Sequence, residues 1–159
     1  MMDKPRSSKP RAIVIGAGPA GLMAAERLVH ADLQVEVYDA MPSAGRKFLL
    51  AGKGGMNLTH AEEFPQFQQR YFNRQQNLER ALHGFTPQHI REWASILGIE
   101  TFIGSSGRVF PVDMKAAPLL RAWLLRLREA GVRFHMRHKW LGFRENGHHF
   151  QTADGEIDV

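Results

Sequence analysis

A glycine-rich segment near the start of the chain has the residue types and spacing to bind a phosphate group. Residues 16–21 read Gly-Ala-Gly-Pro-Ala-Gly and match the pattern G-x-G-x-x-G, between an apolar run and a helical pattern over about 19–30. In that setting the first glycine permits a tight turn, the second lets backbone N–H groups approach a pyrophosphate, and the third allows close helix packing. The segment favours a dinucleotide-binding loop over a purely structural turn. Its expected cofactor-binding residues are Gly16, Gly18, Pro19, Ala20 and Gly21.

An acidic residue follows at the spacing expected for a ribose contact. Asp39 ends a second apolar stretch at 35–38, close to the distance of about 20 residues at which dinucleotide-binding folds place such an acid. Its carboxylate can accept hydrogen bonds from both hydroxyls of an adenosine ribose, and it would repel the 2′-phosphate of NADP. The alternative is a solvated aspartate at the end of a strand.

Apolar runs and helix boundaries predict the elements that position these residues. Strands at 12–15 and 35–38 and the helix between them form a β-α-β unit, and 132–134 is expected to add a third parallel strand. Asn146-Gly147 and Asp154-Gly155 predict hairpin turns. Further helices are expected near 61–73, at 87–97 and at 118–130, and short antiparallel strands at 139–143, 150–153 and from 157 onward.

Several segments together resemble a known group of flavoproteins. Asp39, a short gap and Gly45-Arg46 resemble the extended motif of FAD-binding enzymes in the glutathione-reductase-like superfamily. Residues 45–59 are similar to the hallmark of a bacterial NAD(P)/FAD-dependent oxidoreductase family, the BaiN-like or "aminoacetone oxidase family" flavoproteins, and 104–116 resemble its second signature. The resemblance covers about residues 11–145. Many members read Gly-Arg-Cys-Asn where this chain has Gly-Gly-Met-Asn at 54–57, which removes any cysteine-dependent chemistry.

The resemblance implies an α/β, Rossmann-like FAD-binding domain in which FAD lies extended. The glycine loop would hold the pyrophosphate and Asp39 the adenosine ribose, while the flavin would receive electrons from NAD(P)H for a small-molecule substrate. Beyond the loop, the implied cofactor-binding residues are Asp39, Arg46, Lys47, Asn57 and Thr59, and the backbone of Trp140 against the adenine. Surface positions are the alternative for Arg46 and Lys47, and a turn-stabilising role is the alternative for Asn57. The catalytic residues are unknown.

Other kinds of site fit the residues less well. A Walker loop fails because Gly45 and Gly52 are separated by six residues and Lys53 is followed by glycine instead of Ser or Thr. A metal site is not expected, because the chain has no Cys and two histidines three residues apart, His135 and His138, would point to opposite faces of a strand.

The net charge and the hydropathy of the chain restrict the classes of ligand and macromolecule that it is expected to bind. The net charge of +5 suits an anionic ligand such as a pyrophosphate. No nucleic-acid partner is expected, since the arginines of the 118–130 helix favour a solvated face and no predicted sheet interleaves aromatic with basic residues. No run of 18 apolar residues is present, so neither a membrane span nor a membrane partner is expected, and the protein is expected in the cytoplasm.

The predicted elements also suggest how the chain is organised. Residues 1–10 are expected to form a basic flexible tail, and 11–159 the N-terminal portion of an FAD-binding domain with a mostly helical insertion at about 40–115. Three parallel strands and an antiparallel β-meander leave that domain incomplete, so we expect the isolated fragment to be inactive and the full-length protein to be an FAD-dependent oxidoreductase. The alternative is a non-catalytic truncated product that binds FAD or another adenine nucleotide.

Overall fold

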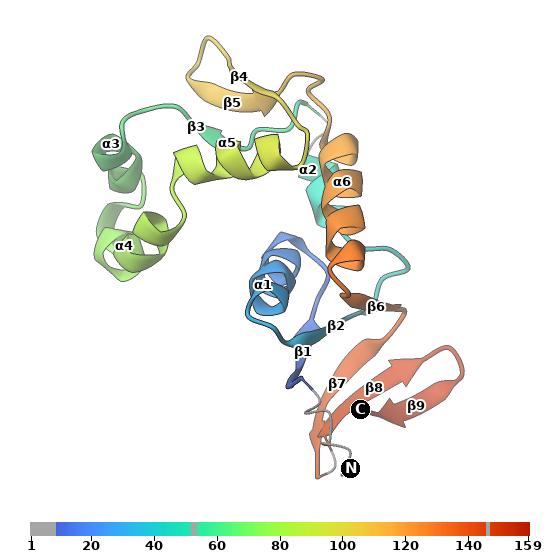
Figure 1. Ribbon diagram of the computed structural model, residues 1–159. Coiled ribbons are helices and arrows are strands. Elements are labelled where there is room, and N and C mark those ends of the chain that lie inside the picture. Colours follow the sequence, from blue (N-terminus) through green and yellow to red (C-terminus); the bar gives the residue numbers. More distant parts are fainter. Residues whose placement is uncertain (1–8, 52–53, 146) are drawn as a thin grey trace, which may run out of the picture. The chain divides into compact units, whose positions relative to one another are not determined.

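The computed structural model describes residues 9–51, 54–145 and 147–159 (Figure 1). The chain divides into two compact units, one formed by residues up to 47 together with 124–159, and the other by 48–123. Most of the expected tail at 1–10 and Asn146 of one expected turn lie outside the described residues. Within the described part of the chain, no helix is both long and apolar enough to cross a membrane.

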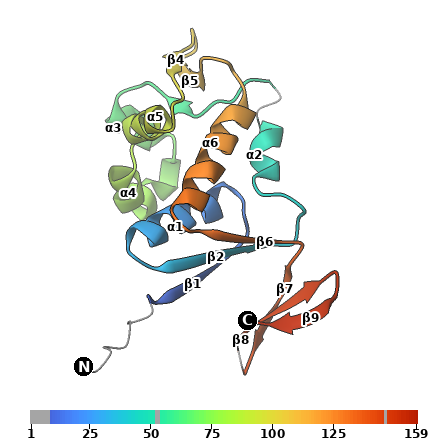
Figure 2. The ribbon, with the colours of Figure 1, turned by 45° about the vertical axis from the view of Figure 1, so that its right-hand side comes forward.

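The first unit contains a three-stranded parallel sheet in the order β1–β2–β6, with α1 against it (Figure 2). The central strand β2 is buried on both faces: Val35 and Val37 are fully buried on one face, and Glu36 and Tyr38 are buried on the other. Leu22 and Ala25 of α1 are likewise fully buried. The elements of this unit are β1 (Arg11–Ile15), α1 (Pro19–His30), β2 (Gln34–Asp39), β6 (Arg133–Met136), β7 (Lys139–Arg144), β8 (Gly147–Thr152) and β9 (Gly155–Asp158).

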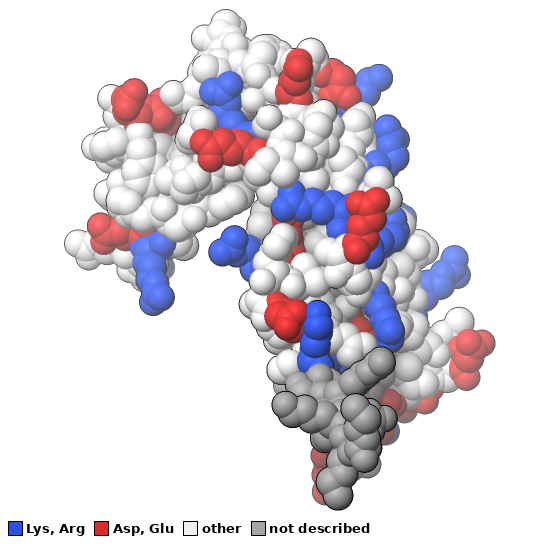
Figure 3. All heavy atoms as spheres, viewed as in Figure 1, with Lys and Arg blue, Asp and Glu red and all other residues white. Residues whose placement is uncertain are grey.

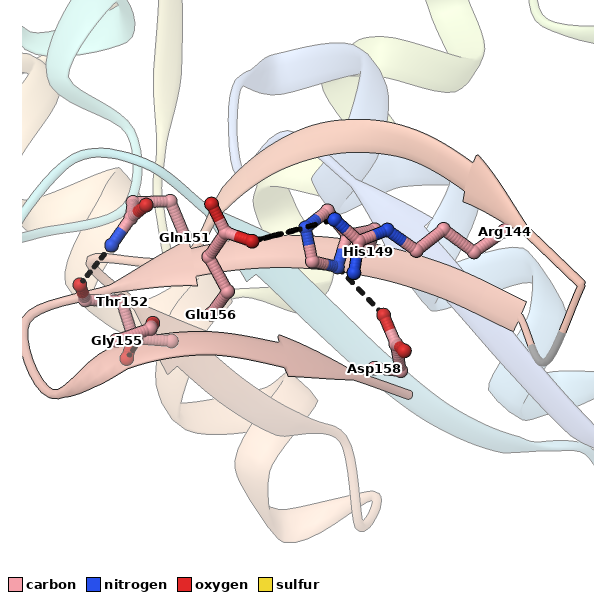
Figure 4. A network of polar contacts seen from close by, with 7 residues as sticks. All are labelled: Arg144, His149, Gln151, Thr152, Gly155, Glu156 and Asp158. Carbon is pink, nitrogen blue, oxygen red and sulfur yellow. Dashed lines mark hydrogen bonds and ion pairs between the residues drawn. The ribbon is translucent and has the colours of Figure 1, made fainter.

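The last three strands form an antiparallel meander in the order β7–β8–β9. A bulge between Trp140 and Gly142 shifts the register of β7, and Gly142 takes the positive φ of 142° that this irregularity requires. On β8 the imidazole of His149 is buried between two carboxylates of β9, 2.6 Å from Asp158 Oδ1 and 3.0 Å from Glu156 Oε2 (Figure 4). This polar clamp holds the final hairpin of the meander together.

The second unit combines helices with a small antiparallel sheet in the order β3–β5–β4. Its core forms around Trp123, whose ring lies 4.7 Å from that of Trp93 and 6.2 Å from that of Phe48, measured between centroids. Helices α2 and α6 run across the boundary between the units. The remaining elements are α2 (Arg46–Ala51), β3 (Thr59–His60), α3 (Phe64–Gln69), the 3-10 helix η1 (Phe72–Arg74), α4 (Gln75–Gly84), α5 (Pro87–Ile96), β4 (Thr101–Ile103), β5 (Arg108–Pro111) and α6 (Ala116–Glu129).

The predicted α/β fold class is confirmed, and most predicted elements agree with the structure within two residues at their ends. The helix predicted near 61–73 is shorter in the structure: α3 covers Phe64–Gln69, and η1 follows with a φ of 47° at Phe72. Helix α4, which starts at Gln75, was not predicted. The sheet of β3, β4 and β5 was not predicted either. Strands of two to four residues are too short to display the alternation of polar and apolar residues that marks a strand.

Candidate nucleotide-binding site

The glycine loop connects the end of β1 to α1 through a turn that only glycine fits well. Gly16 adopts a φ of 102°, and its amide donates a hydrogen bond of 2.7 Å to the carbonyl of Tyr38 on β2. A Cβ atom built on Gly21 would lie 1.8 Å from the carbonyl oxygen of Gly16, far inside any allowed contact. The two glycines therefore make the turn and the close approach of the helix possible.

The N-terminus of α1 is open to an anion. Gly18 is the N-cap residue, no side chain caps the helix, and its first turn contains no acidic residue. Pro19 and Ala20 are exposed as the first two helical residues, and a Cβ atom on Gly18 would meet no atom within 4 Å. Amide groups in the first turn have no acceptor within the helix and carry its partial positive charge. The loop thus has both the space and the polarity for a phosphate group.

Asp39 lies beside this loop at the end of β2. Its Oδ2 atom accepts a hydrogen bond of 2.6 Å from the amide of Ala17, and its Oδ1 atom accepts one of 2.7 Å from the amide of Met41. These bonds hold the carboxylate at the carboxyl ends of the parallel strands, where ligands bind in open α/β sheets. The structure therefore brings the predicted acid and the predicted loop together.

The segment after Asp39 is tied to the corner between β6 and β7. The amide of His138 donates to the Asp39 carbonyl at 2.9 Å and that of Arg137 to the Met41 carbonyl at 3.1 Å. A pocket of about 430 Å³ lies at this corner, and its lining includes two exposed cationic residues, Arg137 and Lys139. The pocket is lined by Ala40, Pro42, Arg137, Lys139, Gln151, Thr152 and Ala153.

Trp140, the predicted adenine contact, is the second residue of β7 and does not line this pocket. Its side chain is 37% exposed and its ring contacts those of Phe143 and His148, with centroids 5.3 and 6.3 Å apart. Its neighbour Lys139 lines the pocket instead. The sequence did not point to Met41, Arg137 or Lys139. A φ of 62° at Arg137, which turns the chain at this corner, has no signature in the sequence.

Behind the site, Tyr38 lies in a cluster of rings that joins β2, β6 and β8. Its ring stacks on His135 at 4.3 Å and on Phe150 at 4.6 Å, while His138 meets it edge-on at 5.6 Å. The prediction that His135 and His138 point to opposite faces is therefore wrong, because β6 ends at Met136 and the left-handed turn at Arg137 brings both rings to Tyr38. Among the described residues, no group of three or more His, Asp or Glu could hold a metal ion.

A buried carboxylate anchors the same cluster. Burial alone would raise the pKa of Glu36, but hydrogen bonds of 2.7 Å from Arg11 and 2.8 Å from the Tyr38 hydroxyl outweigh it and lower that pKa. Burial and the hydrogen bond to Glu36 raise the pKa of Tyr38 to about 12. Burial also lowers the pKa of His135, against the attraction of Glu36. The cluster thus favours an ionised Glu36 beside a neutral Tyr38.

The remaining predicted residues belong to different parts of the chain. Arg46 and Lys47 are exposed at the start of α2, directly after Gly45, whose amide donates to the Ala17 carbonyl of the glycine loop at 2.8 Å. Asn57 and Thr59 belong to the second unit. Asn57 is exposed, whereas Thr59 is buried and its hydroxyl has no hydrogen-bond partner in the described structure. Their part in cofactor binding stays a prediction.

Comparisons with known proteins agree with this fold. A curated relative, the ribosomal RNA dihydrouridine synthase of Haemophilus influenzae, is 43% identical over 53 residues, which are 33% of this chain and 13% of that enzyme. Among solved structures, a 3-ketosteroid-Δ4-(5α)-dehydrogenase from Rhodococcus jostii is 14% identical with a TM-score of 0.64, covering 97% of this chain and 44% of that one. A flavocytochrome c3 fumarate reductase is 15% identical with a TM-score of 0.59, covering 96% and 32%. The chain spans less than half of each of these proteins.

A protein-family model matches a much longer part of the chain than the curated relative does. Residues 10–158 match the model described as the "HI0933-like protein Rossmann domain". That range contains the glycine loop, Asp39 and both flavoprotein signatures. The chain therefore belongs to the HI0933-like family of FAD-binding oxidoreductases, to which its BaiN-like motifs pointed.

Proposed function

We propose that the full-length protein is an oxidoreductase that binds FAD through the glycine loop and Asp39. The observation that carries this proposal is the hydrogen bond of 2.6 Å between the Asp39 carboxylate and the Ala17 amide, next to the uncapped N-terminus of α1. It fixes an acceptor for ribose hydroxyls beside a donor set for a pyrophosphate. The ribose and the pyrophosphate of an adenosine diphosphate group would therefore find complementary partners.

The surroundings of the loop fit the other parts of this cofactor. The pocket at the β6–β7 corner would accept the adenine, with β7 along one side at Lys139, the residue before Trp140. Arg46 and Lys47 would supply positive charge for the pyrophosphate, because the amide of Gly45 ties their segment to the loop. Asn57 and Thr59 stay the proposed residues for the flavin side. The unpartnered hydroxyl of Thr59 supports this role, since a buried hydroxyl without a partner is costly unless a ligand satisfies it.

Bound FAD would supply the transfer of hydride or electrons. The chain itself would bind and orient the cofactor, and Asp39 would disfavour a 2′-phosphate at the ribose. We propose NAD(P)H as the electron donor, a small molecule as the substrate and the cytoplasm as the location. A non-catalytic nucleotide-binding product is the alternative.

The test is purification of the full-length protein and its titration with FAD, followed by its visible flavin spectrum and by calorimetry. We expect a yellow protein whose flavin is bleached by NADH or NADPH without oxygen. Binding of FAD without any reduction would favour the non-catalytic alternative. A colourless protein that takes up no added FAD would contradict the proposal.

A second candidate concerns the substrate. The identity of 43% over 53 residues with a ribosomal RNA dihydrouridine synthase favours reduction of a uracil base in RNA. The net charge of +5 is compatible with such a substrate, although it equally suits the cofactor. The test is incubation of the flavin-loaded protein and NAD(P)H with unmodified ribosomal RNA. Dihydrouridine detected by mass spectrometry would support this candidate, and its absence together with active flavin reduction would refute it.

A further inference from the structure

A short segment of the second unit has a composition unlike the rest of the chain. Residues 64–78, here called the amide hairpin, lie between Glu63 and Glu79 and contain no acidic residue. They comprise α3, η1 and the start of α4. The segment carries aromatic rings, carboxamides and guanidinium groups in close succession: Phe64, Phe67, Tyr71 and Phe72; Gln66, Gln68, Gln69, Gln75, Gln76, Asn73 and Asn77; Arg70 and Arg74.

The amide hairpin is anchored from within. The Gln68 amide is buried and lies 3.3 Å from Nε2 of His83 on α4, and the ring of Phe64 meets the same imidazole edge-on at 4.9 Å. Phe67 and Tyr71 contact each other at 5.8 Å. The two contacts with His83 connect α3 to α4.

The turn between α3 and α4 contains a solvent-exposed aromatic ring, that of Phe72. Phe72 is 83% exposed and adopts a φ of 47°, a conformation that bulky side chains rarely take. Exposed carboxamides surround it in the sequence, at Asn73, Gln69 and Gln76. In Figure 3, the face of the hairpin that is visible is largely uncharged, with charged side chains at its margins. The turn therefore combines one exposed ring with exposed carboxamides close to it in the sequence.

The charges next to the ring favour an anionic partner. Arg70 is paired with Glu62, with Nη2 and Oε2 3.0 Å apart, so much of its charge is compensated. Arg74 is exposed and makes no ion pair within the described residues. One free guanidinium beside an exposed ring, with amides that can donate and accept, matches the chemistry of single-stranded nucleic acid: phosphates, stacked bases and base edges.

We propose that the amide hairpin binds single-stranded RNA, with Phe72 stacked on a base, Arg74 on a phosphate and the exposed amides on base edges. A membrane surface fits less well, because the carboxamides around Phe72 would lose their hydrogen bonds to water in an apolar phase. The proposal departs from the expectation, drawn from the 118–130 helix and from the predicted sheets, that no nucleic acid is bound. It deepens the second candidate function above, in which RNA is the substrate.

The experiment measures the fluorescence anisotropy of a labelled, unstructured RNA of mixed sequence against the full-length protein. Loss of stacking on one base weakens binding about 5- to 150-fold, so we expect this effect from Phe72→Ala and from Phe72→Leu. Phe72→Trp should bind at least as well as the parent. The matched control is Phe143→Ala, since Phe143 on β7 is 74% exposed but lies in the other unit; it should leave RNA affinity unchanged.

A salt series tests the phosphate contact separately. In Arg74→Gln the slope of log K against log salt should become shallower by about 0.7, the value for one phosphate of a single strand. Equal affinity of the parent and Phe72→Ala for RNA would overturn the proposal, as would an equal loss in Phe143→Ala. The proposal would also be overturned, in favour of a membrane surface, if the parent bound anionic phosphatidylserine vesicles but not RNA and Phe72→Ala abolished the vesicle binding.

The same preparations are titrated with FAD to separate this inference from the proposed function. Hairpin variants should bind FAD like the parent. If the parent does not bind FAD, the flavoprotein function is refuted, but the RNA measurement remains valid. Normal FAD binding without RNA binding refutes the hairpin proposal alone.

Discussion

Replacing Gly21 by alanine should damage the fold, because the added methyl has no room. Its Cβ atom would lie 1.8 Å from the carbonyl oxygen of Gly16 and 3.0 Å from the carbonyl carbon. To restore an ordinary contact, α1 or the loop must move by more than an ångström. The loop resists this movement because the Gly16 amide is hydrogen-bonded to Tyr38.

The expected loss in the free energy of unfolding follows from overpacking by the added methyl group. Forcing one extra methyl into a well-packed site typically costs about 1–3 kcal/mol, and occasionally more. For a domain of this size that corresponds to a fall in Tm of about 2–12 °C. Urea unfolding followed by circular dichroism measures the free energy of unfolding, provided that the slope m does not change.

Gly18→Ala is the matched control in the same loop. Its Cβ atom would meet nothing within 4 Å and Gly18 is extended, with a φ of −80°, so the free energy of unfolding should change by less than about 1 kcal/mol. The methyl would instead stand where a pyrophosphate approaches the backbone. Loss of a hydrogen bond to a charged group is worth about 1.5–3 kcal/mol, so FAD affinity should fall about 10- to 150-fold. Equal stability of Gly21→Ala and the parent, or equal destabilisation by the two variants, would refute this reasoning.

Three further predictions concern other contacts. Asp39→Asn loses the charge that the Ala17 and Met41 amides stabilise, so calorimetry should show at least about tenfold weaker FAD binding; unchanged affinity would exclude Asp39 from the site. Because burial lowers the pKa of His135, its contribution to stability is present above about pH 6.5 and falls as the pH drops through that lowered pKa. His135→Phe should flatten the dependence of unfolding free energy on pH between about 7 and 5, and an unchanged slope would refute this. Thr86→Ala removes the hydroxyl that caps α5 through the His89 amide at 3.3 Å and should cost about 1 kcal/mol in urea unfolding; no loss would show that the cap is not stabilising.

The sequence predicted best where one local pattern determines one structure. The loop at 16–21 and the acid at Asp39 follow from glycine spacing and the β-α-β unit, and the structure places them 2.6 Å apart between the Ala17 amide and the carboxylate. Likewise, the helix predicted at 87–97 corresponds to α5 (Pro87–Ile96), which begins with Thr86 as its N-cap and Pro87 in its first turn.

Features that depend on a single dihedral angle or on tertiary contacts were not predictable. The positive φ of Arg137 brings His138 to Tyr38 and creates the pocket corner, yet arginine carries no preference for that conformation. Similarly, the positive φ of Phe72 interrupts the segment predicted as one helix near 61–73, although phenylalanine is not a residue that usually ends helices. In both places the surrounding packing, and not the residue type, selects the backbone conformation.

The measurement that tests the central claim most directly is competition between nucleotides for the full-length protein. The loop and Asp39 are proposed to hold the adenosine diphosphate half of FAD, which ADP shares and FMN lacks. Calorimetric titration should therefore show that FAD binds, that ADP competes with it, and that FMN does not compete at equal concentration. Gly18→Ala and Asp39→Asn should weaken both FAD and ADP. Binding of FMN as tight as that of FAD, or FAD binding that neither substitution affects, would contradict the assignment of this site.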